Sequence, residues 1–364
     1  MKRLEEKKRS AYMEWAKTRS TARFNLATSG LTSVVMAEFP LRVDDLEVTG
    51  GGYGYGPLLE RISRHTGAPV ESIVTAEGTS MANHLAMAAL LAPGDEVVIE
   101  KPTYGLLLDV ARYLGARLKG LPRRFENNFE IALPEMEEAI TPATRLVVLT
   151  NLHNPSGALI SRKRLQAIGE RARAVGAHVL VDEVYLEMLI EPTHASFSLG
   201  ENFLVTSSLT KAYGLSGLRC GWILAAPELA HRIRRLNDLF SATAAHPAER
   251  MSVMAFDHLA QFRERARTLL TANRALLDSF LDSRLDLDVF RPPAGTVVFP
   301  RLTKGEPEVF FRLLREKYET SVVPGEFFEA PRHFRLGIGG PSAELAAGLE
   351  RLGAALDEFG RASA

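Results

Sequence analysis

The feature that most constrains this chain is a series of short apolar runs between about Ile73 and Ala225, separated by longer helical patterns. In Arg145–Thr150 the apolar side chains occupy successive positions instead of alternate ones. Such a strand is buried on both faces, as in a parallel sheet that helices cover on each side. The sequence therefore predicts an α/β protein with a mainly parallel sheet. The predicted strands are Ile73–Ala76, Glu96–Glu100, Ala116–Leu121, Leu146–Thr150, His178–Asp182, Phe203–Ser207 and Gly221–Ala225.

The end of the chain has a different pattern, which predicts a second and smaller unit. A long helical segment from about Pro247 to Ser283 precedes Pro292-Pro293-Ala294-Gly295, where two prolines and a glycine force irregular backbone. Short strand patterns then mix with helix patterns, which suits an α+β domain. The first 45 residues are too few for a domain, so we expect them to pack against this unit. The predicted division is a large domain over residues 46–275 and a small domain made of 1–45 and 276–364.

The composition limits the partners that the protein can have. Lys plus Arg and Asp plus Glu both number 44, so no excess positive charge attracts nucleic acid or anionic lipid. The single cysteine, Cys220, allows neither an intrachain disulfide nor a multi-thiolate metal site. The amino terminus is charged where a secretory signal needs an apolar core, and no apolar run reaches about 18 residues. We expect a cytoplasmic protein with small-molecule partners and without metal, nucleic acid or membrane.

Polar and small residues follow four of the predicted strands, at the strand ends where ligands bind in open α/β sheets. The first of these segments, Glu77–Ser80, begins an apolar helix. Free backbone N–H groups and the positive end of the helix dipole would therefore suit a phosphate group. Asp182 ends a buried strand, and a protonated pyridine nitrogen is one cation that its carboxylate would stabilise. The Glu77–Ser80 segment could equally cap its helix, and Asp182 could equally cap the turn that follows it. The four segments are Glu77–Ser80, Asn151–Gly157, Asp182–Tyr185 and Ser207–Lys211.

Lys211 follows an apolar strand, in a turn rich in serine and threonine. A desolvated lysine near another cation has a lowered pKa, which makes its amine nucleophilic toward an aldehyde. Arg219, eight residues further on, could supply that charge and could bind a phosphate group through its planar fork. Taken alone, each residue is equally compatible with a cation on the surface.

Together these segments resemble the class I/II aminotransferases, which are fold type I enzymes that depend on pyridoxal 5'-phosphate. The shared motifs are Asn154-Pro155-Ser156-Gly157, Asp182-x-x-Tyr185 and Ser208-x-x-Lys211-x7-Arg219, and the resemblance runs from about Leu58 to Gly340. Each motif is weak by itself, whereas the set in this order is specific. The resemblance implies a large domain with a seven-stranded sheet sandwiched by helices, together with a smaller α+β domain.

The resemblance also implies roles for individual residues. It makes Lys211 the Schiff-base lysine, Asp182 the partner of the pyridine nitrogen, and Asn154 and Tyr185 the hydrogen-bond partners of the phenolic oxygen. Arg335 matches the arginine that holds the substrate α-carboxylate, for which a planar, bidentate side chain is suited. Asn154 and Gly30 would be further substrate contacts. The remaining expected coenzyme contacts are Tyr104, which would stack on the ring, and Gly78, Thr79, Ser80, Ser208 and Arg219 around the phosphate.

Enzymes of this family are typically homodimers in which a tyrosine of the neighbouring subunit reaches the phosphate. Tyr53 or Tyr55 is the candidate here, within a glycine-rich segment, Gly50–Gly56. This segment is shorter and richer in glycine than its family counterpart. It contains a G-x-G spacing, but no strand and helix frame it as a dinucleotide fingerprint requires.

The resemblance implies transamination between a small amino acid and a 2-oxo acid. Lys211, displaced from the coenzyme by the substrate amine, would move a proton from the substrate α-carbon. The same early steps serve β-elimination by C–S lyases, decarboxylation, racemisation and amino-acid oxidation, so these reactions stay open as alternatives. Thr79 stands where some aspartate-specific relatives have a lysine, which disfavours that mode of dicarboxylate recognition.

Three other classes of protein fit the sequence less well. Ser208-x-x-Lys211 matches the start of a β-lactamase motif, but the Ser-Asp-Asn and Lys-Thr-Gly tripeptides of those enzymes do not occur. An effector module of a transcription regulator needs a DNA-binding helix-turn-helix, for which residues 1–45 are too short. An inactive scaffold without a coenzyme conflicts with the joint presence of Asn154, Asp182, Tyr185, Lys211, Arg219 and Arg335.

Overall fold

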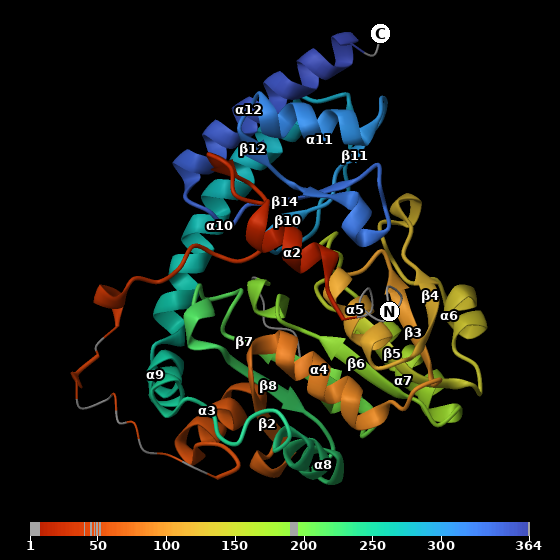
Figure 1. Cartoon of the computed structure of the whole chain (residues 1–364), viewed down its shortest axis with the longest axis vertical. Helices are drawn as coiled ribbons and strands as arrows, with labels where there is room; N and C mark the ends of the chain where they lie inside the picture. Colours follow the sequence, from red (N-terminus) through yellow and green to blue (C-terminus); the bar gives the residue numbers. More distant parts are fainter. Residues whose placement is uncertain are drawn as a thin grey trace.

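The computed structural model describes residues 8–39, 41–43, 46, 48, 50, 52–189 and 196–362. Met1–Lys7 and Gly51, which entered the interpretation of the sequence, lie outside these residues. The larger part contains a seven-stranded sheet with helices on both faces (Figure 1), and each strand lies within two residues of its predicted position. The strands are β2 (Ile73–Glu77), β3 (Glu96–Lys101), β4 (Arg117–Pro122), β5 (Thr144–Thr150), β6 (His178–Asp182), β7 (Phe203–Ser208) and β8 (Cys220–Leu224).

The strands lie in the order β2-β8-β7-β6-β5-β3-β4, and all neighbours pair in parallel except β8, which runs antiparallel to both β2 and β7. Alternate residues of a central strand pack into different hydrophobic clusters. In β5, Leu146 and Val148 face one cluster, whereas Val147 and Leu149 face another. The predicted mainly parallel, doubly covered sheet is therefore confirmed. The helices around it are α3 (Gly56–Thr66), α4 (Gly78–Leu90), α5 (Gly105–Tyr113), α6 (Leu133–Ala139), α7 (Arg162–Ala174) and α8 (Pro227–Asn237).

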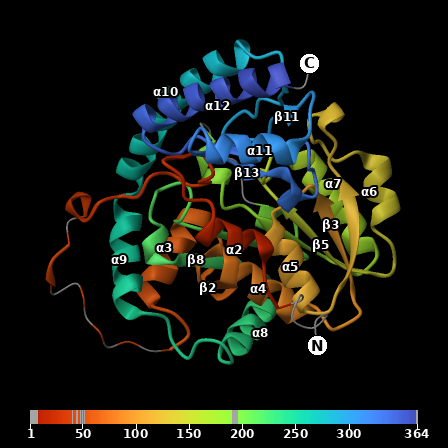
Figure 2. The ribbon, with the colours of Figure 1, turned by 45° about the horizontal axis from the view of Figure 1, so that its top comes forward.

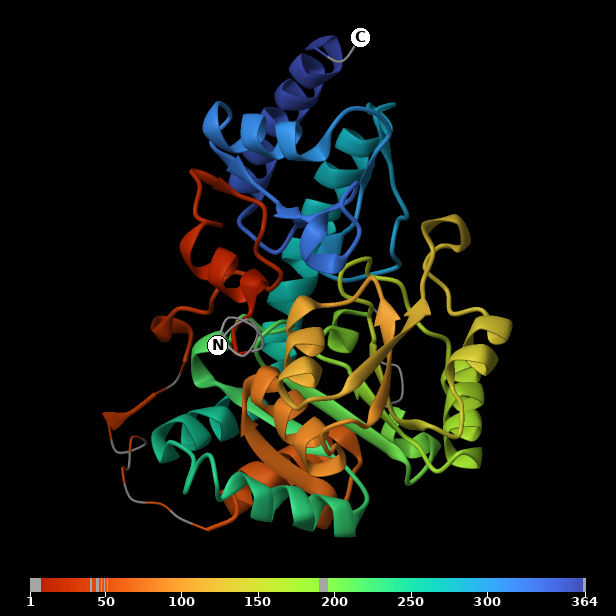
Figure 3. The ribbon, with the colours of Figure 1, turned by 45° about the vertical axis from the view of Figure 1, so that its right-hand side comes forward.

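The carboxy-terminal residues form short strands and helices around a separate hydrophobic cluster. The central strand is β14 (Phe334–Gly337), which pairs antiparallel with β10 (Val297–Val298) and β13 (Val323–Pro324). The amino-terminal strand β1 (Phe24–Asn25) pairs in parallel with β12 (Thr320–Ser321), so an amino-terminal segment lies beside the carboxy-terminal elements (Figure 3). The other elements here are β9 (Leu287–Asp288), β11 (Arg301–Leu302), α11 (Pro307–Glu316) and α12 (Ser342–Ala362).

The long helical segment expected from Pro247 to Ser283 is two helices, α9 (His246–Asp257) and α10 (Leu259–Asp282). They meet at His258, whose φ and ψ of -113° and 12° interrupt the helical path. The first turns of α10 contribute to the cluster beneath β7 and β8, whereas its last turns contribute to the carboxy-terminal cluster. Because α10 runs through residue 275, the helix itself marks no boundary there, and the domain division stays a prediction.

The short helix α2 (Ala11–Thr18) lies between the carboxy-terminal elements and α5 (Figures 2 and 3). Ser10 caps it, because the Ser10 hydroxyl accepts the N–H of Met13 at 3.3 Å. No helix within the described residues has the length and apolar character that a membrane span requires. Short 3₁₀ helices occur at Met36–Glu38, Val70–Ser72, Phe125–Asn127, Leu186–Met188, Ser196–Leu199, Ser216–Leu218 and Gly325–Phe328.

Candidate active site

The carboxyl ends of β5, β6 and β7 open into a cleft of about 270 Å³ beside the start of α4. Most of the site residues expected from the sequence line this one cleft, although they come from distant parts of the chain. Gly30 adjoins it, because a Cβ on Gly30 would lie 3.3 Å from Cδ of Lys211. Ser208 adjoins it through Thr79 and Thr210. The expected residues that line the cleft are Thr79, Ser80, Tyr104, Asn154, Asp182, Tyr185, Lys211, Arg219 and Arg335.

Lys211 lies in the turn after β7 and reaches into the cleft. Its Nζ donates a hydrogen bond to Oγ of Ser29 at 3.1 Å. Burial lowers the pKa of Lys211, and the charges of Arg335 and Arg219 act in the same direction, although Tyr12 and Asp182 oppose them. The lowered pKa raises the fraction of neutral amine, which is the nucleophilic and basic form.

Asp182, at the end of β6, accepts two hydrogen bonds that fix its carboxylate. Asn83 Nδ2 donates to Oδ2 at 2.8 Å, and the Val184 N–H donates to Oδ1 at 3.1 Å. The Thr206 hydroxyl donates to Oδ1 of Asn83 at 2.6 Å, so the Asn83 amide has one possible orientation. Burial raises the pKa of Asp182 to about 6, while these hydrogen bonds and Lys211 oppose that shift. Sequence reasoning missed Asn83, whose only signal was a polar residue on the buried face of the α4 helix.

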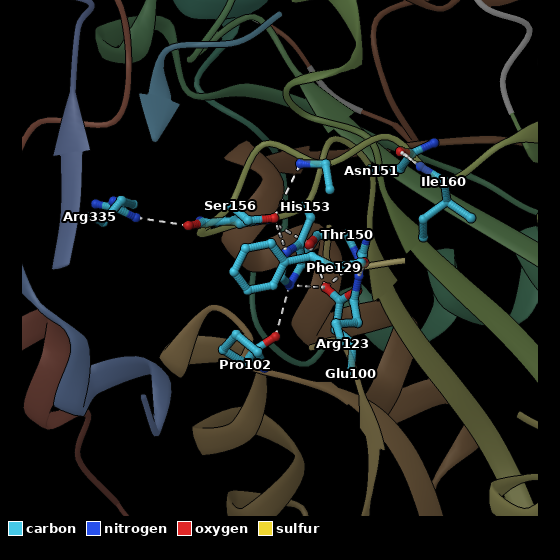
Figure 4. Close-up of polar contacts among 12 residues, drawn as sticks. Glu100, Pro102, Arg123, Phe129, Thr150, Asn151, His153, Ser156, Ile160 and Arg335 are labelled. Carbon is cyan, nitrogen blue, oxygen red and sulfur yellow. Dashed lines mark hydrogen bonds and ion pairs between the residues drawn. The ribbon is translucent and has the colours of Figure 1, made fainter. Parts of the chain in front are cut away.

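Arg335, labelled in Figure 4, extends from β14 toward the turn after β5, and this turn carries Asn154. Its Nη1 donates to Oδ1 of Asn154 at 2.9 Å, and its Nη2 donates to Oη of Tyr12 at 3.0 Å and to the Ala27 carbonyl at 3.2 Å. Its Nε is buried and has no hydrogen-bond partner among the described residues. Because Arg335 occupies Oδ1 of Asn154, the amide N–H groups of Asn154 remain as donors.

A buried polar network around Glu100, Arg123 and Thr150, which the sequence analysis did not single out, supports the turn after β5 (Figure 4). The Glu100 carboxylate accepts Nη1 of Arg123 at 2.7 Å, the Thr150 N–H at 2.8 Å and the Thr150 hydroxyl. The same Thr150 oxygen accepts the Asn154 N–H at 2.9 Å. Burial raises the pKa of Glu100, while Arg123 and Thr150 oppose that shift. Glu100 therefore orients the Thr150 hydroxyl, and that hydroxyl holds the backbone of Asn154.

His153 anchors the same turn on its other side. Nε2 of His153 lies 2.8 Å from the Pro102 carbonyl, and Nδ1 lies 2.6 Å from the Ser156 hydroxyl. Burial, together with the charge of Arg123, lowers the pKa of His153 well below its usual value. The ring is therefore neutral, and since a carbonyl can only accept, Nε2 donates to Pro102 and Nδ1 accepts from Ser156.

The start of α4 and the turn after β7 form a corner that is suited to an anion. Thr79 donates its hydroxyl to Ser208 at 2.7 Å, and the Arg219 guanidinium lies alongside, donating to the Glu77 carbonyl at 3.1 Å. Gly78 has φ +76°, and a Cβ there would lie 2.2 Å from Nη2 of Arg219, so only glycine fits. Free N–H groups of a helix N-terminus, hydroxyls and a guanidinium together bind phosphate well.

Two tyrosines complete the cleft. Burial raises the pKa of Tyr185, which hydrogen bonds with Ser29, so its phenol keeps its proton and can donate. Burial also raises the pKa of Tyr104. The Tyr104 ring contacts the Tyr12 ring edge-on, with centroids 5.4 Å apart and an interplanar angle of 82°. Tyr104 therefore presents a neutral ring to the cleft.

Tyr53 and Tyr55 lie outside this cleft in their own chain. Tyr53 donates to Asp238 at 3.0 Å and accepts from Arg235 at 2.8 Å, and it lines a second cavity of about 320 Å³ that reaches Arg219. Tyr55 contacts the ring of His246 edge-on at 4.9 Å. A role for either tyrosine at a neighbouring subunit's phosphate stays a prediction.

The residues present fit pyridoxal phosphate. The coenzyme needs an amine for its aldehyde, a carboxylate for its ring nitrogen and an anion site for its phosphate. Lys211, Asp182 and the corner at Gly78 supply these three in one cleft. The buried, unpartnered Nε of Arg335 further indicates an anionic group that is still to be bound.

Comparison with known proteins agrees with this geometry. The family model described as aminotransferase class I and II matches residues 41–352. Arginine–pyruvate transaminase AruH of Pseudomonas aeruginosa is 30% identical over 291 residues, which cover 77% of this chain and 74% of that protein. Capreomycidine synthase of Streptomyces vinaceus is 29% identical over 96% of this chain and 94% of that protein. The crystal structure of a PLP-dependent aminotransferase from Streptococcus suis superposes with a TM-score of 0.90 at 27% identity, covering 96% of this chain and 98% of that chain. The chain belongs to the aminotransferase class I and II family, and it is a pyridoxal phosphate-dependent aminotransferase.

Proposed function

We propose that Lys211 binds pyridoxal phosphate covalently through Nζ, and that Arg335 binds the α-carboxylate of the amino acid or 2-oxo acid. One observation carries this proposal: the amine of Lys211 shares a single cleft with the Asp182 carboxylate and with a buried arginine whose Nε has no partner among the described residues. A planar guanidinium with a free N–H is suited to a carboxylate.

The bound coenzyme supplies a ring that withdraws electrons from the substrate α-carbon. Asp182 would hold a protonated ring nitrogen, whose positive charge would lower the pKa of Asp182 and favour the ionised carboxylate. Asn83 holds that carboxylate in place. Asn154 and Tyr185 would donate to the phenolic oxygen, since the Asn154 amide N–H groups remain available and Tyr185 keeps its proton.

Lys211 carries out the proton transfers at the substrate. Lys211 is an amine with a lowered pKa, and its Nζ would lie beside the α-carbon of a bound substrate. It can remove the α-proton and deliver it again, as a general base and then a general acid. The surrounding burial excludes water, which strengthens the effect of Arg335 and Asp182 on the charges that develop.

We also propose that the enzyme is a homodimer. Tyr53 and Phe240, which are 51% and 50% exposed, line the second cavity, and Leu239 beside it is 78% exposed. Exposed apolar side chains gathered at one place are typical of an interface. Light scattering on the purified protein tests this, and a monomeric mass would contradict it. A cytoplasmic location also stays a proposal, based on the single cysteine.

A second candidate function is another reaction of the same coenzyme. The chain is similar over 96% of its length to capreomycidine synthase, whose name is not that of an aminotransferase. The side chains that would hold the coenzyme and move the α-proton serve equally in β-elimination, decarboxylation or amino-acid oxidation. The reaction products therefore decide between the alternatives.

The test combines covalent trapping with product analysis. Borohydride reduction of wild type and Lys211→Ala, each supplied with pyridoxal phosphate, should fix the coenzyme only in wild type, on the peptide that contains Lys211. In a separate assay, the unreduced wild-type enzyme should convert a panel of amino acids to 2-oxo acids and form the aminated coenzyme in equal amounts. Trapping on another lysine contradicts the role of Lys211. Release of carbon dioxide, or of an eliminated side chain, supports the second candidate as an activity beside amino-group transfer.

A further inference from the structure

We propose that α2 and the segment that follows it form the binding site for the substrate side chain, and that this site selects uncharged, apolar side chains. The inference rests on the proposed function, because Arg335 and Lys211 define where the substrate carboxylate and α-carbon lie. It goes further by naming the class of amino acid that the enzyme accepts.

The amino-terminal segment borders both groups that position the substrate. Oγ of Ser29 accepts from Nζ of Lys211, and the Ala27 carbonyl accepts from Nη2 of Arg335 at 3.2 Å. A substrate held between Lys211 and Arg335 therefore lies against this segment, whereas the floor of the cleft is taken by the groups that bind the coenzyme. The amino-terminal residues that line the cleft are Tyr12, Met13, Trp15, Ala16, Ser20, Ala27, Thr28 and Ser29.

None of these amino-terminal lining residues carries a charge. Among the described residues, the charged side chains that line the cleft are Asp182, Lys211, Arg219 and Arg335. All four already have proposed roles with the coenzyme or the α-carboxylate. A substrate such as aspartate or arginine needs an additional partner of opposite charge, since burying an unpaired charge is costly. The charged residues of α2 itself, Glu14 and Lys17, are exposed and do not line the cleft.

The amino-terminal residues that line the cleft form one of its walls, and specific contacts hold this amino-terminal wall in place. Oη of Tyr12 accepts from Arg335 at 3.0 Å, and the Tyr12 ring packs edge-on against Tyr104. Trp15 packs on Phe327 with ring centroids 5.4 Å apart. Sδ of Met13 accepts the Tyr104 hydroxyl at 3.5 Å. Aromatic rings and a thioether adapt well to aliphatic, aromatic or thioether side chains.

The first test measures binding with α-methyl amino acids, which lack the proton that has to leave and therefore bind without turning over. Dissociation constants are measured by calorimetry on the coenzyme-loaded enzyme. The α-methyl forms of phenylalanine, leucine and methionine should bind about tenfold or more tightly than those of aspartate and ornithine. Tighter binding of either charged analogue overturns the inference.

The second test asks whether α2 makes the contact. Trp15→Ala and Met13→Ala should weaken binding of the long apolar analogues by about tenfold and leave α-methylalanine unchanged, because its side chain is too short to reach the wall. Lys17→Ala, on the exposed face of α2, is the matched control and should bind all analogues as wild type does. Equal losses for long and short analogues would mean that α2 only supports the fold, which also overturns the inference.

The two levels of the proposal can fail separately. An enzyme that does not retain the coenzyme on Lys211 contradicts the proposed function. An enzyme that retains it on Lys211, but binds the charged analogues more tightly, contradicts the side-chain site alone.

Discussion

The floor of the cleft and its amino-terminal wall are built in different ways. On the floor, Asp182 and Asn154 are 4% and 5% exposed, and hydrogen bonds from other elements fix both side chains. The wall is a helix of eight residues, whose cleft-lining side chains are held mainly by ring packing. Buried polar groups tolerate little change, whereas apolar contacts can be exchanged at modest cost. The coenzyme chemistry should therefore be hard to alter, and the substrate preference easy.

The largest expected effect is at the floor, in Lys211→Ala. Among the described residues, Lys211 is the one lysine that lines the cleft, so its loss should lower the rate of amino-group transfer by at least about 10³-fold. The variant should still bind pyridoxal phosphate without a covalent link, because the phosphate corner and Asp182 are unchanged. Stopped-flow absorption measures the rate, and equilibrium dialysis measures coenzyme binding. A rate within tenfold of wild type contradicts the role of Lys211.

The second prediction concerns the stability of the coenzyme-free protein. The pKa of Asp182 is raised from 3.8 to about 6, so folding favours its protonated form, and the contribution of Asp182 to the free energy of unfolding is largest below pH 3.8 and is lost as the pH rises toward 6. Above that pH, Asp182→Asn should be more stable than wild type by on the order of 2 kcal/mol, and less so at pH 5.

Urea unfolding of both proteins across this pH range measures the difference. Burial raises the pKa of Glu183 to about 7, and the charge of Asp182 acts in the same direction, so both proteins should also carry Glu183→Gln to isolate the contribution of Asp182. A stability difference that is independent of pH contradicts the raised pKa of Asp182. Adding pyridoxal phosphate should reverse the order, because a protonated ring nitrogen stabilises the ionised carboxylate of wild type only.

Asn83→Leu tests how the floor carboxylate is held. The ionised Asp182 loses its side-chain donor, so the rate of amino-group transfer should fall by about tenfold or more and the pH profile should shift to higher pH. Thr206→Ser is the matched control, since it keeps the hydroxyl that orients Asn83. An unchanged pH profile in Asn83→Leu indicates that Val184 alone positions the carboxylate.

The smallest expected effect is at Thr150, whose hydroxyl lies between Glu100 and Asn154. Thr150→Val removes the hydroxyl between Glu100 and Asn154, and should raise KM for the amino acid by roughly fivefold with a smaller change in kcat. Thr150→Ser keeps the hydroxyl and should restore the wild-type KM. If serine and valine give the same KM, the buried network does not position Asn154.

The sequence predicts the sheet well because each strand is a continuous apolar run that ends at polar or small residues. It also predicts the residues that line the floor, since they follow those runs. It does not reveal Asn83 or Glu100, because their partners lie 99 and 50 residues away, at Asp182 and Thr150. The break at His258 was missed because no proline or glycine marks it.

The contribution of α2 was equally hidden, since Tyr12 and Arg335 are 323 residues apart. A carboxylate in an apolar strand, as at Glu100, was a signal that could have been used, because a buried charge requires a partner.

The helix α10 links two parts of the molecule mechanically. Its 24 residues span about 36 Å and form one continuous rod between the cluster beneath the sheet and the carboxy-terminal cluster. Asn273, buried within α10, donates to the carbonyls of Ile338 and Gly340 at 2.7 and 2.8 Å, directly after the strand that carries Arg335. Spin labels on α10 and β6 would report any change in its tilt. Because the Asn273 amide holds the backbone that follows β14, these two hydrogen bonds couple the position of α10 to that of the strand that carries Arg335.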